Sequence, residues 1–287
     1  MNGFTSADKA MYAAKERGKN NYQFYSTIHH TVNRNLNLEK GLRNAIENNE
    51  LYLYYQPQID LSSNQIVGME ALLRWDHSEL GKISPDEFIP IAEETGLIIP
   101  IGKWVLKSAC QQINAFVEAG YSPRTVSVNV SPYQFKDPNF LEDVKQIIKE
   151  TGMQPELLDI EVTESLMHDI KESRVIIDEL KKIGVHISID DFGTGYSSLS
   201  ILTSLPIDRI KIDRMFINEM TTNLNTSTLV KTIIEMSKNL NTLAVAEGIE
   251  TEEQALQLKR LNCHIGQGYF YYPPISVMEM EKLLLNH

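Results

Sequence analysis

From about residue 36 to the end of the chain, helical patterns alternate with short strand-like runs of apolar residues. Helices are indicated where apolar residues recur every three to four positions, and strands where they recur every second position. The sequence predicts about eight strands, most of them separated by helices. Helical crossovers join parallel strands, so this order predicts an α/β protein whose strands close into a (β/α)8 barrel. An open doubly wound sheet is the alternative, although no G-x-G-x-x-G motif follows a first strand.

The first two strands are expected to form a hairpin, because only a short polar turn separates the runs 51–61 and 64–75. This hairpin makes one strand of the TIM-like barrel antiparallel to its neighbour. The other strands are expected at 125–131, 159–164, 184–191, 207–213, 242–248 and 264–270. Helices are expected at 101–118, 137–150, 170–183, 226–240 and 251–261, and a last helix closes the chain.

Composition excludes several classes of protein. The chain has 287 residues, 42% hydrophobic and 23% charged, which is typical of soluble globular proteins. Its formal charge of -11 disfavours a general nucleic-acid binder. Two cysteines, Cys110 and Cys263, argue against a disulfide framework and suit a reducing cytoplasm. No apolar run reaches the length of a membrane span and no signal peptide is evident, so we expect a cytoplasmic segment without membrane contact of its own.

Polar residues gather where the expected strands end, which is the face of such a barrel that carries chemistry. In 125–131, valines alternate with Ser127 and Asn129, and in 159–164 Ile160 and Val162 alternate with Glu161. The same alternation turns the polar residues of the next strands towards the barrel axis. Several carboxylates are therefore expected to converge. The polar strand-end residues are Glu70, Asn129, Glu161, Asp190, Asp191, Lys211, Asp213, Glu247 and Gln267.

Taken singly, these residues have simpler interpretations: Glu70 or Glu247 alone would be a solvated side chain, and Asn129 alone a satisfied amide. Five converging acids would repel one another unless cations bind between them. Ligation by oxygen alone suits Mg²⁺ or Mn²⁺ and disfavours zinc, and none of the seven histidines has H-x-x-x-H spacing.

A pair of metal ions would give the adjacent Asp190 and Asp191 a function, because one carboxylate can bridge two ions while its neighbour binds one. Such sites hydrolyse phosphoesters. Arg74 and Lys211 could hold phosphate oxygens or orient a water molecule. A rim salt bridge for Arg74 and a partner of Asp213 for Lys211 are equally compatible with the sequence.

The ordered motifs resemble those of EAL-domain cyclic-di-GMP phosphodiesterases across nearly all of residues 36–287. The carrying motifs are GMEALLRW at 68–75, YYQP at 54–57, SPDEFIPIAEETGLI at 84–98, SVNVSP at 127–132, EVTES at 161–165, IDDFGTGYSSLS at 189–200, IKID at 210–213, AEGIE at 246–250 and GQGY at 266–269. The resemblance implies a (β/α)8 barrel with one antiparallel strand and hydrolysis of cyclic-di-GMP to linear pGpG. The departure from relatives is Tyr272-Pro273, where many have a small residue and a basic one.

The resemblance also implies roles for individual residues. Two ions of Mg²⁺ or Mn²⁺ are expected, one held by Glu70, Asn129, Glu161 and Asp190, and the other by Asp190, Asp191 and Glu247. Catalytic roles fall to Lys211, to Glu247 and to Glu164, which anchors the loop after the Asp pair. Gln56, Arg74 and Gln267 match substrate-binding positions. The loop 192–198 lies near the family's dimer contact, so a homodimer is expected.

The N-terminal segment resembles a different family. Residues 5–25 predict a capped helix that ends at Gly18 and a short strand, and ADKAMYAAKERGKNNY matches the end of a GGDEF domain. No G-G-D/E-E-F motif occurs, so cyclase activity is not expected. We therefore predict a GGDEF remnant at 1–25, a linker at 26–35 and the phosphodiesterase domain at 36–287. Upstream segments of a longer protein would carry any sensory input or membrane attachment.

Two other functions compete with hydrolysis of cyclic-di-GMP. One is a receptor that binds the cyclic dinucleotide without cleaving it, but such receptors typically lose metal ligands or the loop after the Asp pair, and this chain keeps both. The other is an unrelated barrel enzyme that acts on a sugar phosphate, which would show no preference for a cyclic dinucleotide.

Overall fold

A computed structural model describes residues 25–121, 125–164, 166, 170–194, 202 and 204–285. The chain divides into two compact units, 1–51 with 75–97 and 52–74 with 98–287. The predicted GGDEF remnant falls almost wholly outside the described residues. Residues 26–35, predicted as a linker, lie within a helix that continues to residue 44. The predicted domain boundaries stay predictions.

The first unit contains helix α2 (Tyr25–Asn44), strand β3 (Gly81–Ile83) and helix α3 (Pro85–Glu94). β3 pairs in antiparallel fashion with the end of β2, at Trp75–His77. Trp75 is buried against Phe88 of α3, and its indole N–H donates to Glu50. An aromatic core and one satisfied indole thus hold this small unit together.

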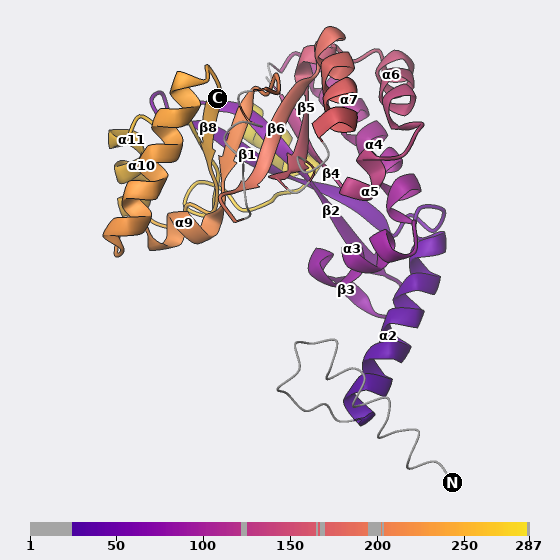
Figure 1. Ribbon diagram of the computed structural model, residues 1–287. Helices are drawn as coiled ribbons and strands as arrows, with labels where there is room; N and C mark the ends of the chain where they lie inside the picture. Colours follow the sequence, from indigo (N-terminus) through magenta and orange to yellow (C-terminus); the bar gives the residue numbers. More distant parts are fainter. Residues whose placement is uncertain are drawn as a thin grey trace. The chain divides into compact units, whose positions relative to one another are not determined.

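The second unit is a closed barrel, as predicted (Figure 1). Its strands are β1 (Leu51–Asp60), β2 (Ile66–His77), β4 (Val126–Val130), β5 (Leu158–Thr163), β6 (His186–Phe192), β7 (Arg209–Ile212), β8 (Leu243–Ala246) and β9 (Ile265–Gly266). The first residue of β1 and the last three of β2 belong to the first unit. Their order is β1-β9-β8-β7-β6-β5-β4-β2, and a β1–β2 pairing closes the ring. β1 runs antiparallel to β9, whereas the pairs from β2–β4 to β8–β9 are parallel. The antiparallel strand expected from the hairpin is confirmed.

Helices cover the outside of the barrel. They are α4 (Ile98–Glu118), α5 (Pro132–Phe135), α6 (Phe140–Thr151), α7 (Ile170–Lys182), α9 (Arg214–Glu219), α10 (Leu224–Asn239), α11 (Glu252–Arg260) and α12 (Val277–Leu284), with a 3-10 turn at Pro155–Leu157. α4 buries the apolar stripe expected from its sequence, including Ile101, Val105 and Phe116. α6 ends at Gly152, whose φ of 67° suits a residue without a Cβ.

Strand parity sorts residues between the barrel axis and the helices. Val126, Val128 and Val130 are buried, as are Ile187 and Ile189, which is the packing expected of the helix-facing side. The run 264–270 differs from its prediction, because only Ile265–Gly266 is strand. Gly268 lies so close to the backbone of Ile249 that a Cβ there would be 2.2 Å from its N and O atoms.

No helix among the described residues is both long and apolar enough to cross a membrane.

Candidate metal and active site

Lys211 of β7 is the centre of the candidate site. Its side chain is 1% exposed, and its ammonium Nζ lies 2.6 Å from Glu161 Oε2 and 2.7 Å from Glu247 Oε1. Asp190 Oδ1 at 3.3 Å and Glu70 Oε2 at 3.5 Å complete its surroundings. Burial alone would lower the pKa of Lys211, but these four carboxylates outweigh burial and raise it well above its ordinary value. The cation is therefore fixed inside a ring of acids.

The pKa values of two of the acids are raised as well, and for them burial is the main cause. Burial raises the pKa of Glu161, opposed by Lys211 and reinforced by Glu70, Asp190 and Asp159. Burial also raises the pKa of Glu247 to about 8 against the effect of Lys211. These carboxylates hold protons more strongly than exposed acids do, and a bound cation would displace those protons.

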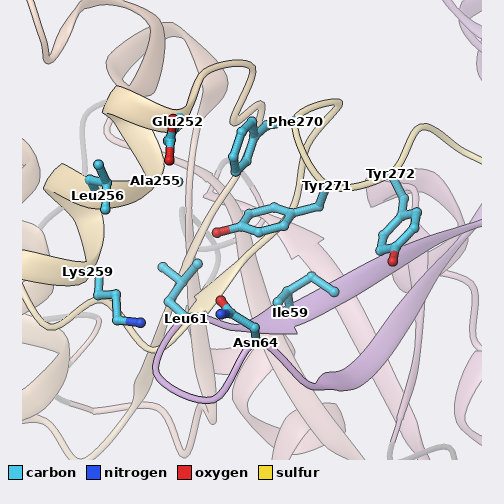
Figure 2. A pocket seen from close by; sticks show the side chains of 10 residues that line it. All are labelled: Ile59, Leu61, Asn64, Glu252, Ala255, Leu256, Lys259, Phe270, Tyr271 and Tyr272. Atoms are coloured by element: carbon cyan, nitrogen blue, oxygen red, sulfur yellow. The ribbon is translucent and has the colours of Figure 1, made fainter. Parts of the chain in front are cut away.

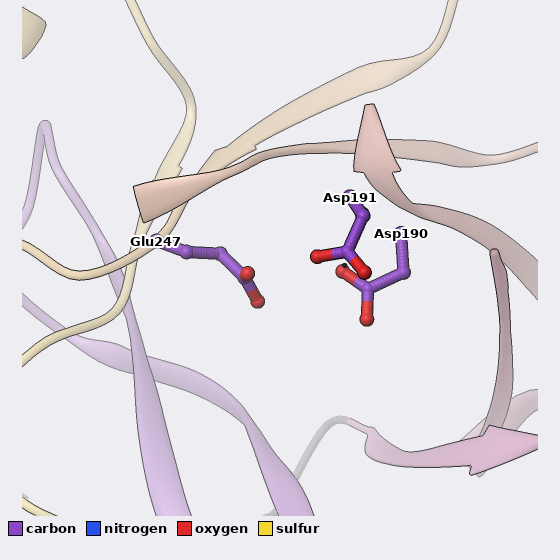
Figure 3. A group of neighbouring side chains, drawn as sticks. All are labelled: Asp190, Asp191 and Glu247. Atoms are coloured by element: carbon purple, nitrogen blue, oxygen red, sulfur yellow. Dashed lines mark hydrogen bonds between the residues drawn. The ribbon is translucent and has the colours of Figure 1, made fainter. Parts of the chain in front are cut away.

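Asp190 and Asp191 point to the same place although they are neighbours in a strand (Figure 3). The β6–β7 register shifts between Ile189 and Phe192, and Asp191 has a left-handed φ of 54°. This β-bulge breaks the alternation that would send adjacent side chains to opposite faces. Oxygen atoms of Asp190, Asp191 and Glu247 consequently lie within 4.8 Å of one another. Burial, Asp190 and Asp213 raise the pKa of Asp191 to about 6.

Glu70 of β2 is held by amides. Asn129 Nδ2 donates to Glu70 Oε1 at 2.6 Å, and Gln267 Nε2 donates to Oε2 at 2.6 Å. Gln267 Nε2 also lies 2.9 Å from Gln56 Oε1, and Gln56 Nε2 donates to the carbonyl of Tyr272 at 3.0 Å. Gln267 thus contacts Glu70 directly, Gln56 contacts Gln267, and Gln56 connects the pair to the loop that carries Tyr272.

Glu164 and Arg74 contact residues outside the carboxylate cluster. Glu164 Oε2 accepts the Gly193 N–H at 3.0 Å, which ties the end of β5 to the start of the loop after the Asp pair. The rest of that loop, 195–200, lies outside the described residues, as does most of the predicted dimer contact. Arg74 donates to the carbonyl of Leu73, and its guanidinium lies 5.9 Å from the ring centroid of Tyr54.

Asp213, also predicted at the strand ends, has a different place. Its carboxylate caps α9 by accepting the Met215 N–H at 2.7 Å, and it faces Asp191. Sequence reasoning did not find Asp159 and Arg209, a buried ion pair deeper in the barrel. Their signal is visible afterwards, because each precedes a site residue of its own strand by two positions.

The donor set fits divalent cations. One ammonium balances one of five carboxylates, so the described cluster keeps an excess of negative charge that hard cations would neutralise. Glu161 Oε1 is buried without a hydrogen-bond partner, and this oxygen is therefore free to coordinate a cation.

A pocket of about 400 Å³ lies elsewhere in the barrel unit, between the β1–β2 hairpin, α11 and the segment after β9 (Figure 2). It is lined by Ile59, Leu61, Asn64, Glu252, Ala255, Leu256, Lys259, Phe270, Tyr271 and Tyr272. None of the clustered carboxylates lines it, although Tyr272 accepts a hydrogen bond from Gln56 through its carbonyl.

Comparison with known proteins points in one direction. The family profile described as "EAL domain" matches residues 39–274. The chain is 42% identical over 283 residues to the bifunctional diguanylate cyclase/cyclic di-GMP phosphodiesterase MucR of Pseudomonas aeruginosa, covering 98% of this chain and 41% of MucR. It is 35% identical to the cyclic di-GMP phosphodiesterase NbdA of the same organism, covering 97% of this chain and 36% of NbdA. The chain thus spans less than half the length of these curated relatives.

Solved structures agree with the sequence comparison. A structure of the PaMucR phosphodiesterase in complex with c-di-GMP superposes with a TM-score of 0.83 at 41% identity, covering 85% of this chain and 99% of that one. The EAL enzyme Bd1971, with cAMP and cyclic-di-GMP bound, gives 0.83 at 32% identity, covering 88% of this chain and 69% of that one.

Proposed function

Because the chain belongs to the EAL domain family, we propose that it is a metal-dependent phosphodiesterase that hydrolyses one phosphodiester of cyclic-di-GMP to linear pGpG. The observation that carries this proposal is the convergence of five carboxylates and Lys211 at the strand ends of the barrel. EAL phosphodiesterases generally use divalent metals, and relatives of this chain are named as cyclic di-GMP phosphodiesterases.

We assign two ions of Mg²⁺ or Mn²⁺ to the site, since two divalent charges would balance the excess that Lys211 leaves. Glu70, Asn129, Glu161 and Asp190 would hold one ion, and Asp190, Asp191 and Glu247 the other. Such ions supply Lewis-acid chemistry, acidifying water and offsetting phosphate charge.

The chain's own residues would do the positioning. Lys211 presents a fixed ammonium to the attacking water or to the charge that develops on phosphate. Gln267 holds Glu70 by a hydrogen bond, Gln56 accepts a hydrogen bond from Gln267, and both would line the substrate site. Glu164 fixes the loop after Asp191 through Gly193. Arg74, whose guanidinium lies over the ring of Tyr54, would contact a phosphate.

The proposal also covers the location of the chain and its assembly. We propose a cytoplasmic location, which suits the two buried free thiols Cys110 and Cys263. We also propose a homodimer through the loop after Asp191, which sedimentation of the purified chain would test. A monomer at all concentrations would remove that part.

The test of function incubates the 287-residue chain with cyclic-di-GMP and Mg²⁺ or Mn²⁺ and follows pGpG by chromatography. We expect turnover that Glu70→Ala and Asp190→Ala abolish. Glu150→Gln, which removes an exposed ion pair between Glu150 of α6 and Lys107 of α4, should leave turnover unchanged. Tight binding without turnover would instead make the chain a receptor. The absence of both binding and turnover would refute the assignment.

A further inference from the structure

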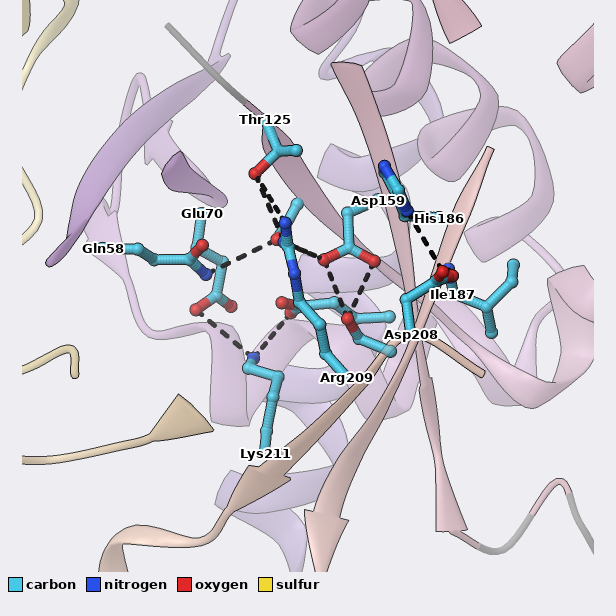
Figure 4. A network of polar contacts seen from close by, with 12 residues as sticks. Gln58, Glu70, Thr125, Asp159, His186, Ile187, Asp208, Arg209 and Lys211 are labelled. Carbon is cyan, nitrogen blue, oxygen red and sulfur yellow. Dashed lines mark hydrogen bonds and ion pairs between the residues drawn. The ribbon is translucent and has the colours of Figure 1, made fainter. Parts of the chain in front are cut away.

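A second set of polar side chains, which we call the lower ring, precedes the site residues on the same strands: Ser127, Asp159, Ser188 and Arg209. Figure 4 shows Asp159 and Arg209 of this ring together with Lys211 of the site. Ser127, Asp159 and Ser188 are fully buried, and Arg209 is 8% exposed. The proposed mechanism uses none of them. Buried charges are costly, so their presence calls for a physical explanation.

Asp159 is the centre of the lower ring. Its Oδ2 accepts hydrogen bonds from Arg209 Nη1 at 2.6 Å and Ser127 Oγ at 3.1 Å. Ser188 Oγ lies 2.8 Å from both carboxylate oxygens. Arg209 also donates to Thr125 Oγ1 at 3.2 Å. One carboxylate of β5 thereby joins strands β4, β6 and β7.

The lower ring and the site share a register. Each of the four strands carries one residue in the lower ring and, two positions later on the same face, one residue in the site. These pairs are Ser127 with Asn129, Asp159 with Glu161, Ser188 with Asp190, and Arg209 with Lys211. A strand that slipped along its neighbours would therefore displace its site residue by the same amount.

We propose that Asp159 and Arg209 are positioning residues for the metal site: their ion pair fixes the levels of β5 and β7 across β6, so that Glu161 and Lys211 meet. This inference rests on the proposed function, since the ligands concerned are those of the same site. Mutation of groups that orient metal ligands typically lowers metal affinity about 10–100-fold.

The alternative for this pair is a purely electrostatic effect, and its signs differ. Loss of the Arg209 cation would then strengthen binding of a divalent ion, and loss of the Asp159 anion would weaken it. Positioning predicts weaker binding in both cases, because either change removes the same link between β5 and β7.

The test measures binding of Mn²⁺ alone to the 287-residue chain by titration calorimetry, together with thermal unfolding. We expect Arg209→Met and Asp159→Asn each to weaken Mn²⁺ about 10-fold or more while the folded barrel persists. Arg209→Lys, which keeps a cation beside Asp159, restores most of the affinity. If Arg209→Met does not fold, the isosteric variant Asp159→Asn provides the test instead.

The matched control is Lys181→Met, which breaks the ion pair of Lys181 with Asp208, the residue before Arg209, at 2.7 Å. It should lower the unfolding temperature without changing Mn²⁺ affinity. Unchanged affinity in folded Arg209→Met or Asp159→Asn, or tighter binding in Arg209→Met, overturns the inference. A wild-type chain that binds Mn²⁺ but cleaves nothing refutes the function alone and leaves this test valid, whereas one that binds no Mn²⁺ overturns both.

Discussion

Lys211 is the one basic side chain that contacts the carboxylate cluster among the described residues. We expect Lys211→Met to destabilise the metal-free protein by about 3–5 kcal/mol, because it leaves buried acids without their cation. Hydrolysis should fall about 100-fold or more with the loss of a preorganised charge. Chemical denaturation in EDTA measures the first effect and a pGpG assay the second.

Lys181→Met is the control for this substitution too, since its ion pair is one-quarter exposed and should be worth less than about 1 kcal/mol. If the two variants are destabilised equally, or if Lys211→Met hydrolyses the substrate at the wild-type rate, Lys211 does not hold the carboxylate cluster together.

Glu247 should make the stability of the metal-free protein depend on pH. Its pKa rises from 4.5 to about 8 on folding, so between these values the folded state holds a proton that the unfolded chain has released. The free energy of unfolding should therefore fall as pH rises from about 4.5 to about 8. Lys211, whose pKa is raised above 10.5, stays charged throughout and adds no slope.

Urea denaturation in EDTA at several pH values checks this expectation, with Glu247→Gln as the control that loses part of the slope. With Mn²⁺ present, the free energy of unfolding should instead rise with pH over this range, because ligands that bind a cation must first release their protons. A metal-free stability that rises with pH over this window would show that the direction is wrong.

The sequence alone predicted some features of single residues and not others. Alternation within strands indicated that Glu161, Asp190 and Lys211 face the axis, and the structure brings the three together. The partners of each side chain were beyond that reasoning, because period-2 patterns give a face and no distances. The same spacing places Asp159 and Arg209 on the site face of their strands, but it could not show that the two form an ion pair.

At the scale of elements, the bulge in β6 is the local feature that puts two consecutive aspartates in one site. Asp191 pays a steric penalty for its φ of 54°, which glycine would avoid. We therefore expect Asp191→Gly to be more stable than Asp191→Ala by about 1 kcal/mol, the reverse of the order in an ordinary strand. Both variants lack the carboxylate, so the comparison isolates the backbone.

Thermal unfolding of the two variants in EDTA measures that difference, and both should lose Mn²⁺ affinity to a similar extent. If Asp191→Ala proves as stable as Asp191→Gly or more so, the left-handed conformation carries no strain. The sequence motif marked these aspartates, but an alternating pattern predicts no bulge. It would have sent Asp191 away from Asp190.

At the scale of the whole molecule, the barrel was predictable and the two-unit division was not. The barrel follows from a repeated order of strands and helices, which a single sequence displays. The first unit joins residues before 52 to residues 75–97, and contacts such as those of Glu50 with Trp75 and Arg34 with Glu87 link the two stretches. Such long-range pairs leave no periodic signal, and the short strand β3 was not expected.

The proposed metal ligands all belong to the barrel unit, so Mn²⁺ should stabilise that unit in particular. The chain's two tryptophans report on the units separately: Trp75 lies in the first unit and Trp104 in α4 of the barrel. Trp75→Phe leaves only the barrel reporter and Trp104→Phe only the other. At 100 times its dissociation constant, Mn²⁺ should add about 2.7 kcal/mol, or about 5–10 °C, to the barrel transition.

Fluorescence-detected melting of both variants, with Mn²⁺ and with EDTA, measures these shifts. The Trp104 transition should rise with Mn²⁺ and the Trp75 transition should move less, because none of the proposed ligands lies in the first unit. Equal shifts would mean that the units unfold as one. Absence of any shift at saturating Mn²⁺ would count against the metal site itself, since a ligand that binds only the folded state must raise its melting temperature.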